Sequence, residues 1–317
     1  MTIVAFTTAS IRSQYMRRAG LTGSTACVAV LVIVAPAMSQ APPGTDILVA
    51  DLGTLNGVYY LVGDPKNVTK RPNAYDNQPF FTPDSRSILF TAGYEDGNDG
   101  QTEIHRYYLR ANRIARITRT GESEYSPTPV PGDKAFSAVR VEADSTQRLW
   151  RFTMEGMDPE VILPNLDPVG YHAWADPNTL LLFVLGEPST LRLADLSTAH
   201  VEIVAENVGR SIHKIPTRHA FSFTQRVSDD EAWITELDPN TRETTRLVRT
   251  LSGGDFHAWT PDGTLLMADG GSIYQWNPDL AEGWQLIADL GGMGLEFSRL
   301  AVSPDGTKIA VVGQATN

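Results

Sequence analysis

The chain has 317 residues, with 26 Lys and Arg, 37 Asp and Glu, and a single Cys. A formal net charge of −11 argues against a nucleic-acid binder, which would be basic or carry a basic stripe. The hydrophobic fraction of 42% is that of a globular protein, and one Cys cannot form an internal disulfide or a cysteine zinc site. The length allows one large domain or two ordinary ones.

Residues 1–39 have the features of a secretory signal peptide. They contain no Asp or Glu, and Arg17 and Arg18 precede an apolar run over residues 26–36. A charged start, a short apolar run and small residues after it are the three parts of such a signal. The run is too short to cross a bilayer comfortably, so we expect no stable membrane span in the mature protein.

Cleavage is expected next to the small residues that follow this run, between Ser39 and Gln40. The first fifteen residues are long and weakly charged for the start of a signal peptide, which makes Met16 an alternative start of the chain. Cleavage would remove Cys27 together with three Arg and no acid, and would take the formal charge from −11 to −14. We therefore expect a periplasmic or secreted mature protein that contains no cysteine.

A turn that contains proline recurs along the rest of the chain, and its prolines are Pro83, Pro131, Pro177, Pro216, Pro261 and Pro304. The clearest copies have the sequence Thr-Pro-Asp or Ser-Pro-Asp. Their mean spacing of about 44 residues is typical of the four-stranded blades of a β-propeller. Proline presets φ in a tight turn and a following Gly or Asn tolerates positive φ, so each copy predicts a hairpin.

Short β-rich runs flank each turn. After the first turn come an apolar run at 88–90, an alternating run at 103–108 and a fourth run at 114–117. Apolar runs are typical of strands packed on both faces, whereas alternation indicates a half-exposed strand. No segment has convincing helical periodicity. The same succession predicts five blades at residues 75–118, 121–163, 166–205, 209–249 and 253–288.

The two ends of the repeat predict a sixth blade. Residues 47–69 contain two outer strands with no inner pair, and residues 297–312 contain two inner strands with no outer pair. Their combination would close the ring and remove its exposed sheet edges. We therefore predict a single domain over residues 40–317, an all-β, six-bladed β-propeller of four-stranded antiparallel blades.

The first blade resembles the repeat of the TolB-type, WD40-like propellers. The resemblance rests on the residues at 76–84, 88–91, 100–104 and 114–118, and related phrases cover nearly the whole chain after residue 40. It implies the propeller architecture. TolB proteins also carry an α/β domain before the propeller, and only residues 40–46 stand in that place here. The docking roles of that domain are therefore not implied, and the repeat itself occurs in scaffolds, peptidase side domains and lyases.

Alignment on the turn places one residue of each blade at the start of the innermost strand, and these residues are Pro79, Pro127, His172, His213, His257 and Leu300. In a propeller this position lies near the mouth of the central channel. Three neutral imidazoles that converge there can ligate a divalent transition metal, and some propeller lyases are similar in having a histidine-rich metal site on the axis. The alternative is that the histidines form the rim of a wet channel or contact a ligand directly. No carboxylate accompanies them that would serve as a base.

Aromatic residues also occur where the chain begins several blades. Tyr75, Tyr125, Tyr171 and Phe256 are candidates to line a funnel for a peptide or glycan. The sequence contains no GxSxG, GxxxxGK[ST], GxGxxG or HExxH motif. Two functions follow: a cofactor-free binding or scaffold module for a protein, peptide or glycan partner, or a metal-dependent lyase or hydrolase that uses the three histidines.

Overall fold

The computed structural model describes residues 44–316 except residues 72, 94–99 and 133. The expected signal peptide, the alternative start at Met16 and the expected cleavage point at Ser39-Gln40 lie outside the described residues. Residues 41–317 form one compact unit. Its described part contains twenty-four strands and two short 3-10 turns, η1 (Leu251–Gly253) and η2 (Gly291–Met293). None of the described residues belongs to a helix of the length and apolarity that a membrane crossing needs.

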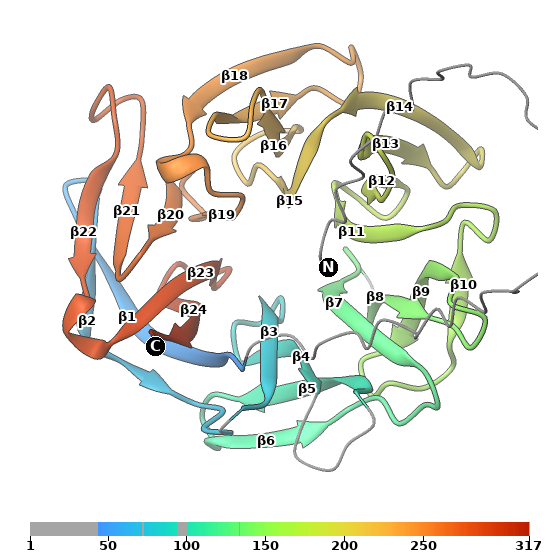
Figure 1. Cartoon of the computed structure of the whole chain (residues 1–317), viewed down its shortest axis with the longest axis horizontal. Coiled ribbons are helices and arrows are strands. Elements are labelled where there is room, and N and C mark those ends of the chain that lie inside the picture. Colours follow the sequence, from blue (N-terminus) through green and yellow to red (C-terminus); the bar gives the residue numbers. More distant parts are fainter. Residues whose placement is uncertain (1–43, 72, 94–99, 133, 317) are drawn as a thin grey trace, which may run out of the picture. The chain divides into compact units, whose positions relative to one another are not determined.

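The strands form six four-stranded antiparallel sheets, which are the blades of a ring (Figure 1). Blade 1 consists of β3 (Tyr75–Phe81), β4 (Ser87–Gly93), β5 (Thr102–Tyr108) and β6 (Arg113–Arg116). Blade 2 consists of β7 (Ser123–Pro129), β8 (Ala135–Val141), β9 (Gln147–Thr153) and β10 (Glu160–Ile162). Blade 3 consists of β11 (Val169–Trp174), β12 (Thr179–Val184), β13 (Thr190–Asp195) and β14 (His200–Glu206).

Blade 4 consists of β15 (Val208–Lys214), β16 (Phe221–Arg226), β17 (Ala232–Leu237) and β18 (Thr244–Arg249). Blade 5 consists of β19 (His257–Trp259), β20 (Leu265–Asp269), β21 (Ser272–Trp276) and β22 (Gln285–Asp289). Blade 6 combines β1 (Asp46–Leu55) and β2 (Val58–Asn67) with β23 (Leu295–Val302) and β24 (Lys308–Ala315). The predicted fold class is confirmed, and the five continuous blades begin and end within a few residues of the predicted bounds.

Ring closure depends on the pairing of β1 with β24. These strands form an antiparallel ladder from Asp46↔Gly313 to Asp51↔Lys308, and Lys308 also forms an ion pair with Asp51. The order β2-β1-β24-β23 makes the early strands the outer pair and the late strands the inner pair, as predicted. This ladder therefore joins the first strand of the propeller to the last one and closes the ring.

The recurrent turn is built by its own polar side chains. In the first copy Thr82 Oγ1 donates to Asp84 Oδ1 at 2.6 Å and accepts from the Ser87 amide at 3.1 Å. In the last copy Ser303 and Asp305 make the same bond at 2.6 Å. The hydroxyl and the carboxylate thus satisfy backbone groups of a tight hairpin, which explains why this phrase recurs.

Packing between blades supplies the core. Buried apolar side chains fall into six clusters, and each cluster joins two neighbouring blades. The second strands are therefore covered on both faces, and every residue of β4 is buried. Stability comes from contacts between blades as much as from contacts within them, so one blade alone would lack most of its core.

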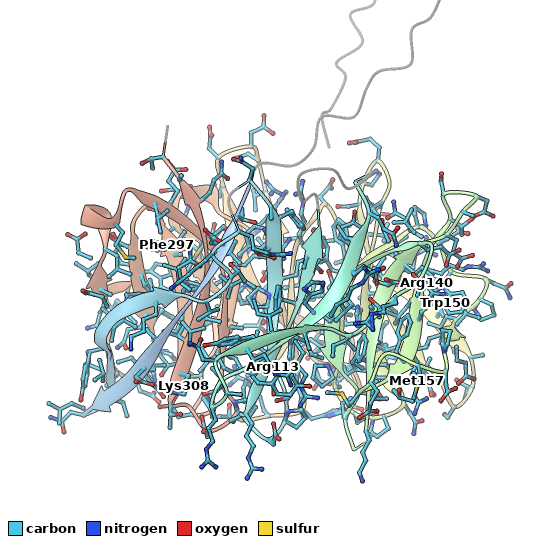
Figure 2. All side chains as sticks on the ribbon, turned by 90° about the horizontal axis from the view of Figure 1, so that it is seen from below. Arg113, Arg140, Trp150, Met157, Phe297 and Lys308 are labelled. Atoms are coloured by element: carbon cyan, nitrogen blue, oxygen red, sulfur yellow. The ribbon has the colours of Figure 1, made fainter. Side chains whose placement is uncertain are left out.

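A polar cluster lies at the contact of blades 1 and 2. The fully buried Glu124 accepts hydrogen bonds from Arg140 Nε at 3.1 Å and from Thr120 Oγ1 at 2.7 Å. Arg140 also pairs with Glu122 at 3.3 Å and lies 4.5 Å from the centre of the Trp150 ring, beside which it is seen in Figure 2. Burial raises the pKa of Glu124 to about 7, so this carboxyl titrates near neutrality.

Candidate functional site: the axial cavity

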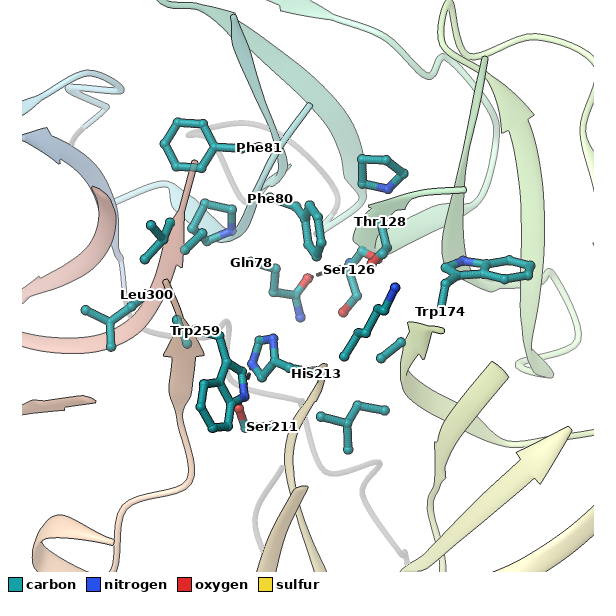
Figure 3. Close-up of a pocket in the computed structure, with 18 of the residues that line it drawn as sticks. Gln78, Phe80, Phe81, Ser126, Thr128, Trp174, Ser211, His213, Trp259 and Leu300 are labelled. Atoms are coloured by element: carbon teal, nitrogen blue, oxygen red, sulfur yellow. Dashed lines mark hydrogen bonds between the residues drawn. The ribbon is translucent and has the colours of Figure 1, made fainter. Parts of the chain in front are cut away.

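The innermost strands of all six blades surround a cavity of about 590 Å³ on the axis of the ring. This volume lies within the range of ligand pockets. Its wall contains all six positions that the alignment on the turn placed at the start of the inner strands: Pro79, Pro127, His172, His213, His257 and Leu300. Figure 3 shows Phe80 and His213 pointing into the cavity from different blades.

His172 belongs to a contact between blades. Its Nε2 lies 2.6 Å from the hydroxyl of Ser137 in β8 of the preceding blade, and the indole N–H of Trp174 donates to the same hydroxyl at 2.9 Å. All three side chains are buried. The serine therefore ties the His-Ala-Trp segment of blade 3 to blade 2.

His257 repeats this arrangement two blades further on. Its Nε2 lies 2.9 Å from Ser222 Oγ in β16, and the indole N–H of Trp259 donates to that hydroxyl at 2.8 Å. The two similar sequence phrases that end in His-Ala-Trp thus build the same serine-centred contact in two places. The recurrence of these histidines has a structural cause in the packing of neighbouring blades.

His213 lies against His257. The two ring centres are 4.9 Å apart in an edge-to-face arrangement, and His213 Nε2 lies 3.0 Å from Ser211 Oγ. Ser211 in turn accepts from the His257 amide at 3.2 Å. Burial lowers the pKa of His213 to about 4, that of His172 to about 3, and that of His257 well below its usual value, so all three rings are neutral at pH 7.

The three histidines do not form a metal-binding set. Among the described residues, no group of three or more His, Cys, Asp or Glu side chains is arranged to hold a metal ion. Nε2 of His172 and of His257 is occupied by a serine hydroxyl, and Nδ1 of each ring is buried without a described hydrogen-bond partner. The Nε2 atoms of His172 and His257 are thus engaged in contacts between blades.

The predicted aromatic residues lie close to arginines, and two of the four line the cavity. Tyr171 and Phe256 line the cavity wall. Tyr75 and Tyr125 are half-buried and do not belong to this wall. Arg299, Arg210, Tyr171 and Tyr125 are nevertheless close enough to Tyr75 to influence its pKa electrostatically. Burial is the main cause that raises the pKa of the Tyr75 hydroxyl, so it stays protonated at neutral pH.

Arg299 spans the axis of the ring. It extends from β23 in blade 6, and its Nη2 donates to the hydroxyl of Tyr171 in the opposite blade 3 at 2.9 Å. Its guanidinium carbon lies 3.9 Å from the centre of the Phe256 ring and 4.8 Å from that of Tyr171. Two aromatic rings thus hold a positive charge at the cavity wall.

Further charged and polar residues of the wall were not predicted from the sequence, and five of them are Gln78, Ser126, Arg210, Lys214 and Arg299. All but Lys214 lie where the inner strand shifts register against its neighbour, at β-bulges in blades 1, 2, 4 and 6. A bulge turns a side chain away from the regular alternation of the strand. A signal was present, because Gln78, Ser126 and Arg299 each directly precede an aligned cavity position.

Two of these bulges have an unusual backbone. Gln78 and Ser126 occupy the same place in blades 1 and 2, and both have φ of 56° although neither is glycine. Gln78 Oε1 accepts from the Ser126 amide at 2.8 Å and from Thr91 Oγ1 at 2.7 Å, while Ser126 Oγ is buried without a described partner (Figure 3). Left-handed backbone at non-glycine residues carries strain and clusters at binding sites.

Comparisons with known proteins bear on the fold. No protein-family model and no curated protein matches the sequence. Among solved structures, a TolB-assigned protein from Agrobacterium tumefaciens has a TM-score of 0.64 at 13% identity and covers 87% of this chain and 100% of its own. TolB from Acinetobacter baumannii has a TM-score of 0.55 at 14% identity over 86% of this chain, which spans 65% of that TolB.

An oligogalacturonate lyase in complex with manganese has a TM-score of 0.53 at 12% identity and covers 87% of this chain and 92% of its own. At identities this low, the likeness concerns the fold and carries no residue roles. The six four-stranded blades, the closure by both ends of the repeat and the likeness to two TolB structures agree with one another. The chain is a TolB-like six-bladed β-propeller.

Proposed function

We propose that this propeller is an exported, non-catalytic binding module that holds a segment of a protein or peptide partner in its axial cavity without a bound metal. One observation carries the proposal: a cavity of about 590 Å³ to which all six blades contribute side chains. Aromatic, proline and aliphatic side chains make up most of its wall, with few polar groups among them. This composition is typical of sites that bind extended ligands by shape and orient them by a few polar contacts.

Export is part of the proposal and rests on the sequence. Residues 1–39 have the composition of a cleaved leader, and cleavage at Ser39-Gln40 would leave a mature propeller of residues 40–317 in the periplasm or outside the cell. The mature chain would contain no cysteine, so it could form no disulfide in an oxidising compartment.

The metal-dependent alternative finds no support in the donor geometry. A metal-dependent lyase or hydrolase would need His172, His213 and His257 to share an ion, and two of these rings instead link neighbouring blades through serines. The manganese belongs to the oligogalacturonate lyase, which is similar to this chain in fold alone. A binding role requires only a cavity lined by side chains of all six blades, so it is the function that we propose.

A single engineered thiol tests the proposal. In a Cys27→Ser background the chain has no other cysteine, so Phe80→Cys places one reactive thiol in the cavity wall, where Phe80 is 39% exposed. Thr245→Cys, on the exposed outer strand β18, is the matched control. We expect a bulky maleimide at residue 80 to abolish capture of envelope partners, whereas the same label at residue 245 leaves capture unchanged. Capture that is indifferent to the label at residue 80 would refute the proposal.

A further inference from the structure

The charge of the cavity is opposite to that of the protein. The whole chain carries a formal charge of −11, yet the described residues that line the cavity include Arg210, Lys214 and Arg299 and no Asp or Glu. Field lines from several like charges in a low-dielectric recess are focused into it and attract the opposite charge. An acidic protein whose described carboxylates all lie outside one recess, while three cations line it, has a local preference for anions there.

Among the described residues, no carboxylate neutralises these three cations. Arg210, Lys214 and Arg299 take part in no ion pair with a described carboxylate, whereas other cations, such as Arg140 and Lys308, do. The hydrogen bond of Arg299 is with the neutral Tyr171 hydroxyl, and its flat faces contact aromatic rings. A guanidinium held in this way keeps further N–H donors for a carboxylate, which it binds with paired hydrogen bonds.

Backbone geometry adds a second, independent indication. The bulges that bring Arg210 and Arg299 into the cavity have counterparts at Gln78 and Ser126, where the chain adopts positive φ. Ser126 Oγ is buried at the cavity wall and has no described hydrogen-bond partner. A buried hydroxyl without a partner costs free energy unless a ligand or water completes it. The three cationic residues and Ser126 thus line one cavity.

We infer that the cavity selects an acidic peptide segment, with a side-chain or terminal carboxylate seated at Arg299 and within reach of Arg210 and Lys214. This inference deepens the proposed function and depends on it. The occupant is a peptide because Pro79, Pro127, Ile212 and other apolar side chains form the rest of the wall, and these suit the apolar side chains between acidic residues. A polyhydroxylated glycan would leave many hydroxyls unpaired against such a wall.

The test compares two pools of fluorescein-labelled hexapeptides that are identical except that Asp and Glu in one pool are Asn and Gln in the other. Fluorescence anisotropy measures the binding of each pool to the full chain. We expect the acidic pool to bind at least tenfold more tightly at low salt, and the preference to shrink as the salt concentration rises. Tetragalacturonate, an acidic glycan without apolar side chains, is expected to compete weakly.

A triple substitution and its matched control locate the charge effect. Arg210→Gln, Lys214→Gln and Arg299→Gln together should abolish the preference for the acidic pool. Lys66→Gln, Arg242→Gln and Arg246→Gln change the net charge equally at exposed sites and should preserve it. Thermal unfolding and near-ultraviolet circular dichroism show whether both variants are folded. If the triple variant does not fold, Arg299→Gln alone is tested in its place, and we expect it to reduce the preference for the acidic pool severalfold.

The outcomes separate the two proposals. If both pools bind equally well and the maleimide label at residue 80 blocks both, the acidic selectivity is overturned, whereas the cavity remains a peptide-binding site. Tight binding of tetragalacturonate without any peptide binding would overturn the peptide assignment. Capture of a partner that the label at residue 80 does not affect would overturn the proposed function itself.

Discussion

The serine-centred contacts between blades make a quantitative prediction for Ser137→Ala. Ser137 is fully buried, and its hydroxyl serves both the indole N–H of Trp174 and Nε2 of His172. Alanine would leave two buried polar groups without a partner, each at a cost of about 1–3 kcal/mol. We therefore expect the free energy of unfolding to fall by about 2–4 kcal/mol, a large part of the 5–15 kcal/mol that typical proteins have.

Equilibrium unfolding in urea measures this loss. Ser228→Ala, at an exposed serine, is the matched control and should change the free energy of unfolding by less than about 0.5 kcal/mol. Adding Trp174→Phe to Ser137→Ala removes one of the two orphaned groups, so the two changes should cost less together than the sum of their separate costs. Strict additivity, or a loss for Ser137→Ala no larger than that of the control, would refute the interblade role of this hydroxyl.

Three further predictions concern pH and ring closure. His172 and His257 are neutral in the fold and have an unfolded pKa near 6.5, so their contribution to stability is present above this pKa and is lost as the pH falls below it. With its folded pKa of about 3, His172 should contribute a loss of roughly 2 kcal/mol between pH 7 and pH 5, which urea titration of His172→Gln would show as a weaker loss of stability in acid, and His257 acts in the same direction. Glu124 has the opposite sign: its folded pKa of about 7 exceeds the usual 4.5, so its contribution to stability is present below pH 4.5 and is lost by pH 7, and Glu124→Gln should weaken this decline in the same titration. Deletion of residues 308–317 removes β24, and the variant should show no cooperative thermal transition by circular dichroism, since β1 and β23 lose their shared partner.

The architecture was predictable because the repeat leaves a periodic trace in the sequence. The proline turn recurs in each blade since the same hairpin recurs, and its Thr82 and Asp84 make local hydrogen bonds that do not depend on distant parts of the chain. The composite blade was predictable because residues 47–69 and 297–312 each contain half a repeat. The periodic pattern of the sequence reflects the geometry of each hairpin and the order of the strands, and both are the same in every blade of the ring.

The character of the site was less predictable. Alignment on the turn placed His172 and His257 at the axis, but it did not show that Ser137 and Ser222, each 35 residues earlier, would occupy their Nε2 atoms. Such contacts depend on how neighbouring blades pack, which has no periodic trace. Arg299 was not predicted for a related reason. It lies at a β-bulge, and the regular alternation of side chains along a strand does not predict which way a residue at a bulge points.

Site-specific photo-crosslinking in the source cell tests whether the axial cavity is where the partner binds, with a photoreactive amino acid in place of Phe80 in the cavity or of Thr245 on the outer strand. We predict a discrete partner adduct at residue 80 that the acidic hexapeptide pool suppresses in an extract, and no such adduct at residue 245. Adducts that form at residue 245 while residue 80 gives none would contradict the claim that the axial cavity is the binding site.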